Sequence, residues 1–481
     1  MLRYVRIYSA LLRALFLCFL TVEASAQSFW RDPYRVDDRT APAPGEPWIP
    51  GSPLPAVEQS ASVKPPPAGA LLSLPELTEY ALRNNPRARQ AWYAARAAAA
   101  GVGIELADDL PTITGGIGLS RVRPVSGTSG VESPWQTRFG PSVSFSYVLY
   151  DFGVGDDQVR AAEYRLLAAN LNQNRVLQDI IFQVEQAYYR TLGLESLVRV
   201  NQLALENVNT SLGAARGRRE SGMATVADVY RTETQVAQAE LNLTRSKGEF
   251  EKSKGLLASA VGLPVNSALQ VKTVTSLPQI TQMTESLTAL IERAKSNRPD
   301  LIAAEAQARG ARAAASAVSK SGLPTIEVVG STARTFYEPD RVPPSTAYAA
   351  ALNVRIPLFN GFRETYSKRQ SLELAAQAEA SRDTLARQTE LDVWQAYYDL
   401  QTAAGALSST EAQVKSAEQT AQATLARYKG GFGSILDLIT SQQDEVNARV
   451  QRIQSHLDWY TAFARLNFSA GNALLGTRDK K

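Results

Sequence analysis

Hydrophobic residues along this chain follow two different periods, and each period occurs twice. Between Ser142 and Leu149 they occupy every second position, and a similar alternation runs from Tyr348 to Leu358. Alternation with a period of two predicts β-strands with one apolar face. Partner strands are predicted across glycine-, proline- and serine-rich stretches, at Thr112 to Arg121 and Thr325 to Thr335. The pattern therefore predicts two hairpins, with four strands of about ten residues, the length of a tilted membrane strand.

Long proline-free stretches follow each hairpin. From Val154 to Arg216, and again from Arg363 to Arg427, apolar residues keep a helical spacing. A helix of about 63 residues would be ~95 Å long, well beyond the usual globular helix. Shorter helices are predicted at Leu74 to Ala107 and Val226 to Val261, and these two could stack end to end alongside one long helix. Such pairing would build a helical wall with a polar face toward water.

Strands and helices belong to an internal duplication. The Leu-Pro-Thr-Ile sequence at 110–113 recurs 213 positions later at 323–326, and the Gln-Ala-Tyr-Tyr sequence at 186–189 recurs 209 positions later at 395–398. The offset changes because two corresponding loops, Val122 to Phe139 in the first copy and Phe336 to Thr346 in the second, differ in length. Because surface loops tolerate length changes, we interpret the repeat as structural. Three further residues recur at the second offset: Gly222, Asp228 and Gly262 match Gly431, Asp437 and Gly471.

The amino-terminal residues resemble a signal peptide. Arg3 and Arg6 precede a short apolar run, and Ala24-Ser25-Ala26 offers small residues for cleavage. We therefore divide the chain into a signal peptide (1–26), a proline-rich extension (27–70), a first repeat (71–263), a linker (264–285), a second repeat (286–475) and a carboxyl-terminal tail (476–481).

The composition limits the kinds of functional site that this chain could form. The only cysteine, Cys18, lies in the predicted signal peptide, so the mature chain would lack thiols for disulfides or metal ligands. Lipidation at Cys18 is disfavoured because bulky Leu17 precedes it. The net charge of +4 gives no support for nucleic-acid binding. No later segment approaches the roughly 18–20 apolar residues of a transmembrane helix.

An enzyme is not expected. The single histidine, His456, lies in a predicted helix without a metal-binding HxxxH or HExxH pattern around it. Carboxylate pairs such as Asp108-Asp109 fall near helix or strand ends, where capping explains them. We therefore predict no catalytic residue, no cofactor and no metal.

Four strands cannot close a barrel, and open strand edges are not tolerated in lipid. Eight strands from two chains would leave an interior filled by side chains, whereas twelve strands from three chains would leave a lumen. The sequence therefore predicts an internally duplicated α+β membrane protein, in which three chains form a twelve-stranded β-barrel continuous with a long α-helical tunnel.

Motifs in both copies make residues 74–475 resemble the TolC family of outer-membrane factors. They are Asn85-Pro86 and Arg298-Pro299, the Leu-Pro pairs that enter the strands, the segments 149–153 and 358–361 that leave them, and Ala-Tyr-Tyr in each long helix. The resemblance implies a homotrimer in the outer membrane of a Gram-negative bacterium, with its helices in the periplasm. It also implies an exit duct for efflux or type I secretion, working with a periplasmic adaptor and an inner-membrane pump or ABC transporter. The alternative is a structural or adhesive coiled-coil surface protein.

The turns at 219–224 and 429–434 are expected at the periplasmic tips. Glycines suit such reversals, and the residues expected to dock the adaptor are Gly222, Met223, Gly430, Gly431 and Gly433.

The resemblance also implies a periplasmic gate. Tyr428 and Asp228 match a hydrogen-bonded latch, and Asp437 matches a ring of carboxylates at the constriction. By position alone, Asp437 is equally well an exposed acid that favours the positive end of its helix. Two departures, Thr440 in place of a second acid and Gly433 in place of an arginine, predict a simpler and less negative constriction.

Overall fold

The computed structural model describes residues 71–123, 135–267, 269–272, 286–338 and 343–471. The predicted signal peptide with Cys18, the proline-rich extension, the carboxyl-terminal tail, parts of both predicted loops and most of the predicted linker lie outside the described residues. The described residues all belong to one compact unit.

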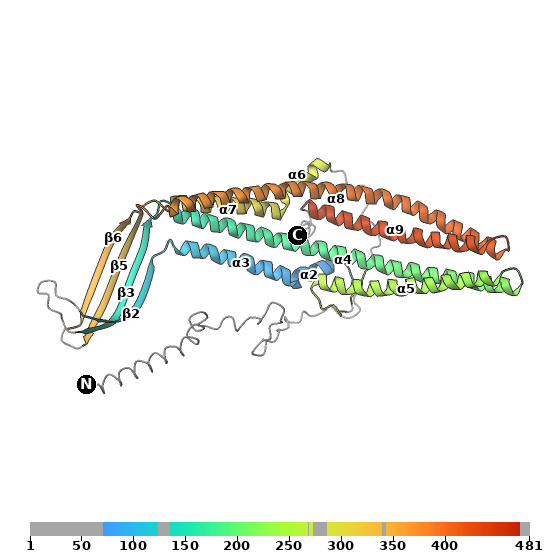
Figure 1. Ribbon diagram of the computed structural model, residues 1–481, viewed down its shortest axis with the longest axis horizontal. Coiled ribbons are helices and arrows are strands. Elements are labelled where there is room, and N and C mark those ends of the chain that lie inside the picture. The colour runs from blue at the N-terminus through green and yellow to red at the C-terminus, as the bar shows by residue number, and fades with distance from the viewer. Residues whose placement is uncertain (1–70, 124–134, 268, 273–285, 339–342, 472–481) are drawn as a thin grey trace, which may run out of the picture. The chain divides into compact units, whose positions relative to one another are not determined.

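The four predicted strands form one antiparallel sheet in the order β2-β3-β5-β6 (Figure 1). Pairing of β3 with β5 joins the hairpins of the two copies. Of the boundaries that differ from the prediction, two have a clear cause. β3 starts inside the expected loop because its first residues pair with the end of β5, and β6 stops before Pro357, which cannot donate a ladder hydrogen bond. The strands are β2 (Thr112–Val122), β3 (Gln136–Tyr150), β5 (Thr325–Glu338) and β6 (Ser345–Arg355).

Strand register gives the sheet two chemically different faces. Tyr147 lies opposite Val328, which in turn lies opposite Leu352, so large apolar side chains share one face. Ser144 lies between Thr114 and Ser331 on the other face, which carries mainly small and polar side chains. The edge strands β2 and β6 each pair on one side only within this chain.

Each copy contributes one helical hairpin and one broken helix. The long helices α4 (Val154–Glu220) and α8 (Arg363–Lys429) have 67 residues each, close to the predicted length. α3 and α5 both pack along α4, and α7 and α9 both pack along α8 (Figure 1). The shorter helices are α2 (Leu74–Asn84), α3 (Pro86–Ala107), α5 (Val226–Val261), α6 (Leu287–Asn297), α7 (Pro299–Lys320) and α9 (Ile435–Ser469).

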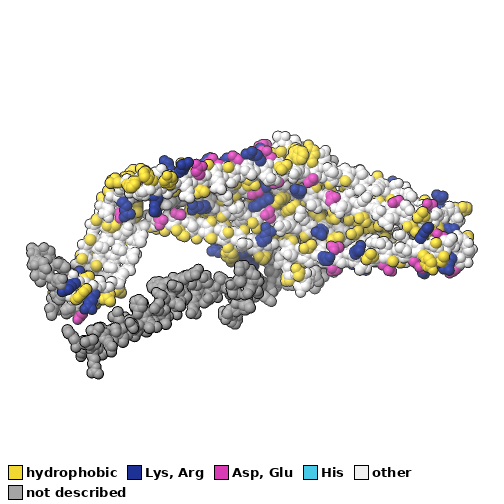
Figure 2. Space-filling view, in the orientation of Figure 1, with side chains coloured by type: hydrophobic (Ala, Val, Ile, Leu, Met, Phe, Trp, Pro, Cys, Tyr) yellow, Lys and Arg dark blue, Asp and Glu magenta, His cyan; other side chains and the backbone are white. Residues whose placement is uncertain are grey.

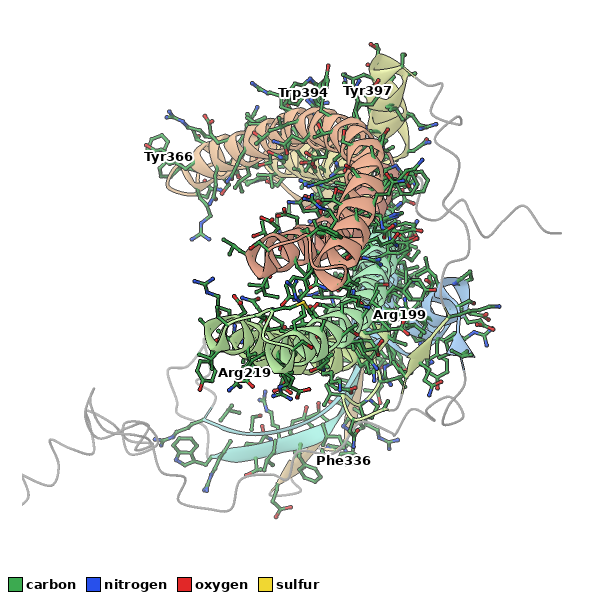
Figure 3. All side chains as sticks on the ribbon, turned by 90° about the vertical axis from the view of Figure 1, so that its right-hand side faces the viewer. Arg199, Arg219, Phe336, Tyr366, Trp394 and Tyr397 are labelled. Carbon is green, nitrogen blue, oxygen red and sulfur yellow. The ribbon has the colours of Figure 1, made fainter. Side chains whose placement is uncertain are left out.

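Contacts between the copies order the helices into a layer. α4 also packs against α7 and α9, which gives the order α3-α4-α7-α8 near the sheet and α5-α4-α9-α8 toward the turns. Figure 3 shows the two hairpins beside each other in a view turned by 90° from Figure 1. α8 therefore forms one end of the layer, and α3 and α5 form the other. Among the described helices, no apolar stretch is long enough to cross a membrane.

The prediction of one continuous helix from Leu74 to Ala107 was wrong. The chain leaves helical geometry at Asn85, where ψ is 124°, and at Arg298 in the second copy, where ψ is 118°. The cause is the following proline in each copy, which lacks an N–H and disfavours helical geometry in the residue before it.

Different side-chain contacts stabilise the two helix breaks. The Asn85 side chain accepts a hydrogen bond from the Arg87 N–H and donates one to the Ala260 carbonyl, at 2.9 and 3.1 Å. Arg298 is only 3% exposed and forms ion pairs with Asp300 and Asp392, at 2.7 and 2.9 Å. The second break therefore depends on charge pairing across helices.

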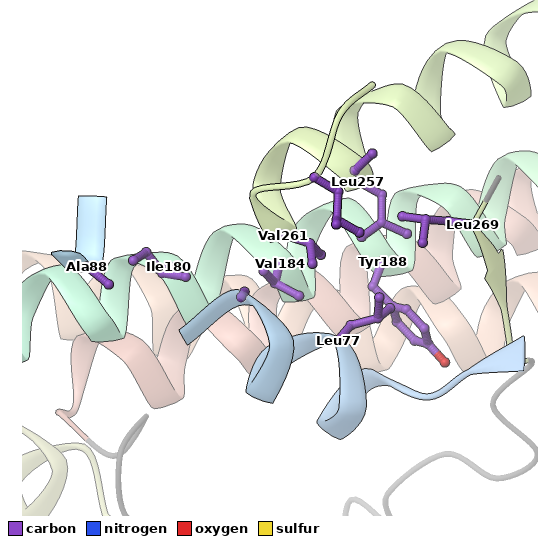
Figure 4. Packing of buried hydrophobic residues seen from close by; sticks show 11 residues of the cluster. Leu77, Ala88, Ile180, Val184, Tyr188, Leu257, Val261 and Leu269 are labelled. Atoms are coloured by element: carbon purple, nitrogen blue, oxygen red, sulfur yellow. The ribbon is translucent and has the colours of Figure 1, made fainter. Parts of the chain in front are cut away.

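A parallel pair of two-residue strands, β1 (Leu71–Leu72) and β4 (Gln270–Val271), lies beside the first copy. Sequence analysis missed both, and β4 falls in the predicted linker. The Tyr188 hydroxyl donates a hydrogen bond to the Lys272 carbonyl next to β4. The pair covers a hydrophobic cluster drawn in Figure 4, which includes Leu77, Val184, Leu257 and Val261.

Candidate functional site

The turns that end the two helical hairpins have the same backbone geometry. In the first, the Met223 and Gly222 N–H groups donate to the carbonyls of Arg218 and Arg219, at 2.8 and 2.9 Å. This double hydrogen bond is a Schellman motif, which requires a left-handed residue after the helix. Gly222 supplies that residue with φ of 73°.

The second turn repeats this arrangement 209 positions later. The Phe432 and Gly431 N–H groups donate to the carbonyls of Arg427 and Tyr428, at 3.0 and 3.2 Å, and Gly431 has φ of 86°. Gly430 has right-handed helical geometry, with φ of −75°, and so does not need to be glycine for conformational reasons.

The backbone of the second turn approaches Gly433 closely. A Cβ atom there would lie 3.0 Å from the Tyr428 nitrogen, tighter than ordinary contact. Its counterpart in the first turn is Ala224. A side chain at 433 would therefore need the backbone near Tyr428 to shift by a few tenths of an ångström.

Acidic residues follow both turns at the start of the return helices. Asp228 forms a capping box with Thr225: its carboxylate accepts hydrogen bonds from the Thr225 N–H and hydroxyl, each at 2.9 Å. Asp437 is exposed in the first turn of α9, where the Ser434 side chain caps the helix. A carboxylate in that position is favoured by the helix dipole.

Tyr428 is buried between the hairpins. Its side chain is 2% exposed and packs with Ile435 and Leu438 of α9 and with Ala214 of α4. The guanidinium of Arg218 lies 4.5 Å from the centre of the Tyr428 ring and donates hydrogen bonds to the carbonyls of Tyr428 and Met223, at 2.7 and 3.3 Å. Arg218 thus connects the end of α4 to both turns.

Sequence analysis did not identify Arg218. The available signal was its place in the last turn of α4 beside Arg219, but cations are common there because they favour the helix dipole. The cation–π contact with Tyr428 depends on residues 210 positions apart, a neighbour that local spacing does not reveal.

The predicted latch residues lie near each other but are not joined by a hydrogen bond. Burial raises the pKa of Tyr428, the negative charge of Asp228 raises it further, and Arg218 opposes both effects. Within the described residues, the buried Tyr428 hydroxyl has no hydrogen-bond partner. The carboxylate of Asp228 accepts its hydrogen bonds from Thr225 and not from Tyr428. The latch between Tyr428 and Asp228 therefore stays a prediction.

Apolar side chains are exposed at both turns. Met223 and Phe432 occupy equivalent positions and are 61% and 84% exposed, and Leu436 follows at 56%. Figure 2 shows hydrophobic and charged side chains side by side over this end of the hairpins. Exposed apolar groups rimmed by charges are typical of protein interaction sites.

The other candidate groups are the histidine His456 and clusters of metal-ligating residues. Burial and the neighbouring Arg452 lower the pKa of His456, so its imidazole is neutral at pH 7. Across the part of the chain that the structure describes, no group of three His, Cys, Asp or Glu residues is placed to hold a metal ion.

Comparisons with known proteins agree with this architecture. The family model described as outer membrane efflux protein matches residues 77–263 and 290–472. Protein CyaE of Bordetella pertussis is 27% identical over 421 residues, which cover 86% of this chain and 88% of that protein. The pyoverdine export outer membrane protein OpmQ of Pseudomonas putida is 25% identical over 416 residues, covering 83% and 85%.

Among solved structures, the outer-membrane channel OprN superposes with a TM-score of 0.76 at 19% identity, covering 83% of this chain and 90% of that one. This likeness supports the α+β fold of strands joined to long paired helices.

Proposed function

Because the chain belongs to the outer membrane efflux protein family, we propose that it forms the exit duct of a tripartite efflux or type I secretion system. It is an outer-membrane channel protein of a Gram-negative bacterium and extends into the periplasm. In this proposal a periplasmic adaptor couples the duct to an inner-membrane pump or ABC transporter. That pump supplies the energy, and the duct transports passively without catalysis of its own.

The observation that carries the proposal is the sheet that continues into the helical layer. One face of the sheet is apolar and suits lipid, and the other carries small polar side chains that suit a water-filled lumen. A structural or adhesive coiled-coil protein would need the helices but would have no use for such a sheet.

Free edges support a homotrimer. The strands β2 and β6 each lack a partner on one side within this chain, and three chains would close them into a twelve-stranded barrel with a lumen. The end helices of the layer also expose aromatic residues. They are Trp92 and Tyr93 on α3, and Tyr366, Trp394 and Tyr398 on α8, two of which are labelled in Figure 3.

The hairpin turns are the proposed gate and docking surface. Tyr428 and Asp228 would form the latch that holds the tips together, and three copies of Asp437 would meet at the constriction and favour cations. The two turns, with Gly222, Met223, Gly430, Gly431 and Gly433, would receive the adaptor. Exposed Met223 and Phe432 offer it apolar contacts.

Single-channel conductance in planar bilayers tests the duct and the latch. The wild-type protein is expected to form channels of low conductance, and the Tyr428→Phe/Asp228→Ala variant channels of several-fold higher conductance. The control is Tyr230→Phe/Asp444→Ala, at exposed positions on the return helices. Unchanged conductance in the latch variant rejects the latch, and absence of any channel rejects the duct.

Crosslinking tests the docking surface. A photoreactive probe on Phe432→Cys is preferable to one on Gly431→Cys, because a cysteine at φ of 86° would be strained. Capture of the adaptor by this variant, and not by Tyr366→Cys near the sheet, would support docking. Equal capture at both positions would contradict it.

A further inference from the structure

A cavity of about 410 Å³ lies between α4 of the first copy and α9 of the second. Its size falls within the range of small-molecule sites, roughly 300–1,000 Å³, which are mainly apolar with a few placed polar groups. Leu192, Val200, Leu203, Ile453 and Leu457 provide apolar walls. The stacked rings of Tyr189 and Tyr460, with centroids 4.4 Å apart and planes at 9°, add a flat aromatic surface.

All the charged side chains that line the cavity are cations. Arg199, Arg449 and Arg452 line it together with His456, and no Asp or Glu does. Arg449 is neutralised by Glu418 and Glu445, at 2.9 and 2.8 Å, which stand outside the lining.

Arg452 is the uncompensated charge. Within the described residues its guanidinium makes no hydrogen bond and no ion pair, and the residue as a whole is partly buried. Arg199 reaches only Glu195, at 3.5 Å, and Ser196. A guanidinium without a partner beside apolar walls favours an anionic ligand that can accept its paired N–H donors.

A close approach of the helices sets one side of the cavity. A Cβ atom at Gly193 would lie 2.4 Å from the Leu457 side chain, so glycine allows Leu457 to pack directly on α4. Leu192 and Tyr189 also contact the hydrophobic cluster of Figure 4. The cavity therefore has a packed boundary on this side.

The duplication shows that this set of residues is not a requirement of helix packing. At the same offset of 209, Arg452 corresponds to Leu243, Arg199 to Ser408 and His456 to Lys247. Tyr460 corresponds to Glu251, and Gly193 to Thr402. Both copies build long hairpins, but only one has arginines, stacked tyrosines and a glycine at these positions.

We propose that the α4–α9 cavity binds an amphipathic organic anion, a carboxylate or sulfonate on a flat apolar body. Arg452 binds the acidic group, with Arg199 at the rim, and the body lies against Tyr189, Tyr460 and the leucines. The site belongs to the helical wall of each chain and is separate from the turns that form the proposed gate.

Titration calorimetry with 2-naphthalenesulfonate on the full-length protein in neutral maltoside micelles tests this site. Wild type is expected to bind one probe per chain, and Arg452→Gln to weaken binding about tenfold or more through the loss of a charged hydrogen bond. Lys247→Gln is the control, because it also removes one positive charge. Lys247 lies in the other copy, at the position equivalent to His456. The affinity of this variant should equal that of wild type.

Two further measurements keep the test decisive. The neutral analogue 2-naphthalenemethanol should bind at least tenfold more weakly than the sulfonate, and Leu203→Trp, which fills the cavity, should abolish binding while the channel conductance stays normal. Absence of saturable binding to wild type, equal binding of the neutral analogue, or equal affinities for Arg452→Gln and Lys247→Gln would each overturn the proposal. None of these outcomes bears on the duct function, which conductance measures separately.

Discussion

The two helical hairpins end in the same backbone turn but are anchored by different side chains. Both turns have the paired Schellman hydrogen bonds and a left-handed glycine. In the second turn Tyr428 is buried, whereas its counterpart Arg219 is exposed. Arg218 contacts Tyr428, whereas its counterpart Arg427 is exposed. Duplication preserved the backbone hydrogen bonds, and later divergence gave the second hairpin an anchor on the first.

The same contrast holds where each short helix breaks. A polar amide, Asn85, holds the first break through backbone groups, whereas a buried cation, Arg298, holds the second through two carboxylates. Proline fixes the position of a break in both copies, but the residue before it determines what the break contacts.

Arg298→Ala should cost about 3–5 kcal/mol of unfolding free energy, because it leaves the carboxylates of Asp300 and Asp392 without their main partner. Arg175, 3.6 Å from Asp300, compensates only in part. The matched change Asn85→Ala should cost about 1–2 kcal/mol. Thermal unfolding of the purified protein compares the two, and equal losses of melting temperature would show that the ion pairs add nothing.

Glu185→Gln should stabilise the protein at pH 8 and have little effect at pH 4. Burial raises the pKa of Glu185 to about 7 from its ordinary value of 4.5. The folded chain therefore binds an extra proton between these values, and the free energy of unfolding falls as pH rises through this window, by up to about 3 kcal/mol. The counterpart in the second copy, Trp394, cannot ionise.

Melting temperatures of wild type and Glu185→Gln from pH 4 to 8 measure this effect. The difference should grow with pH and level off above pH 7. A difference independent of pH would mean that Glu185 is ionised or protonated alike in the folded and unfolded chains.

Arg218→Gln should loosen the second turn by about 2 kcal/mol, because it removes the cation–π contact and a charged hydrogen bond to Tyr428. Higher conductance and faster tryptic cleavage after Lys429 are the expected readouts. Arg427→Gln is the matched control at the exposed counterpart. If both variants behave alike, the two hairpins do not differ in anchoring.

Gly222→Ala and Gly431→Ala should each cost about 1–2 kcal/mol, because a side chain is disfavoured at left-handed φ. Neither glycine has an atom within 4 Å of the added Cβ, so the backbone conformation alone sets the cost. Tryptic cleavage at each turn measures it, and the two turns should respond equally. A much larger effect in one turn would contradict the shared geometry.

The sequence by itself determined most of the long elements of this protein. Alternation with a period of two predicted β3 and β6, and β2 and β5 were predicted as their partners across the loops. Helical spacing without proline predicted α4, α5 and α8 to within a few residues. These patterns are local consequences of backbone geometry. The duplication then predicted equivalent turns, because the same glycine spacing gives the same left-handed helix end.

Only the tertiary structure decided which residues of different elements meet. The contact of Arg218 with Tyr428, the ion pair of Arg298 with Asp392 and the cavity between α4 and α9 all join residues far apart in the chain. Pairing of β1 with β4 was missed for the same reason, since two-residue strands carry no period. The period of apolar residues in the sequence predicts which face of an element is apolar, but the packing of the helices determines what that face contacts.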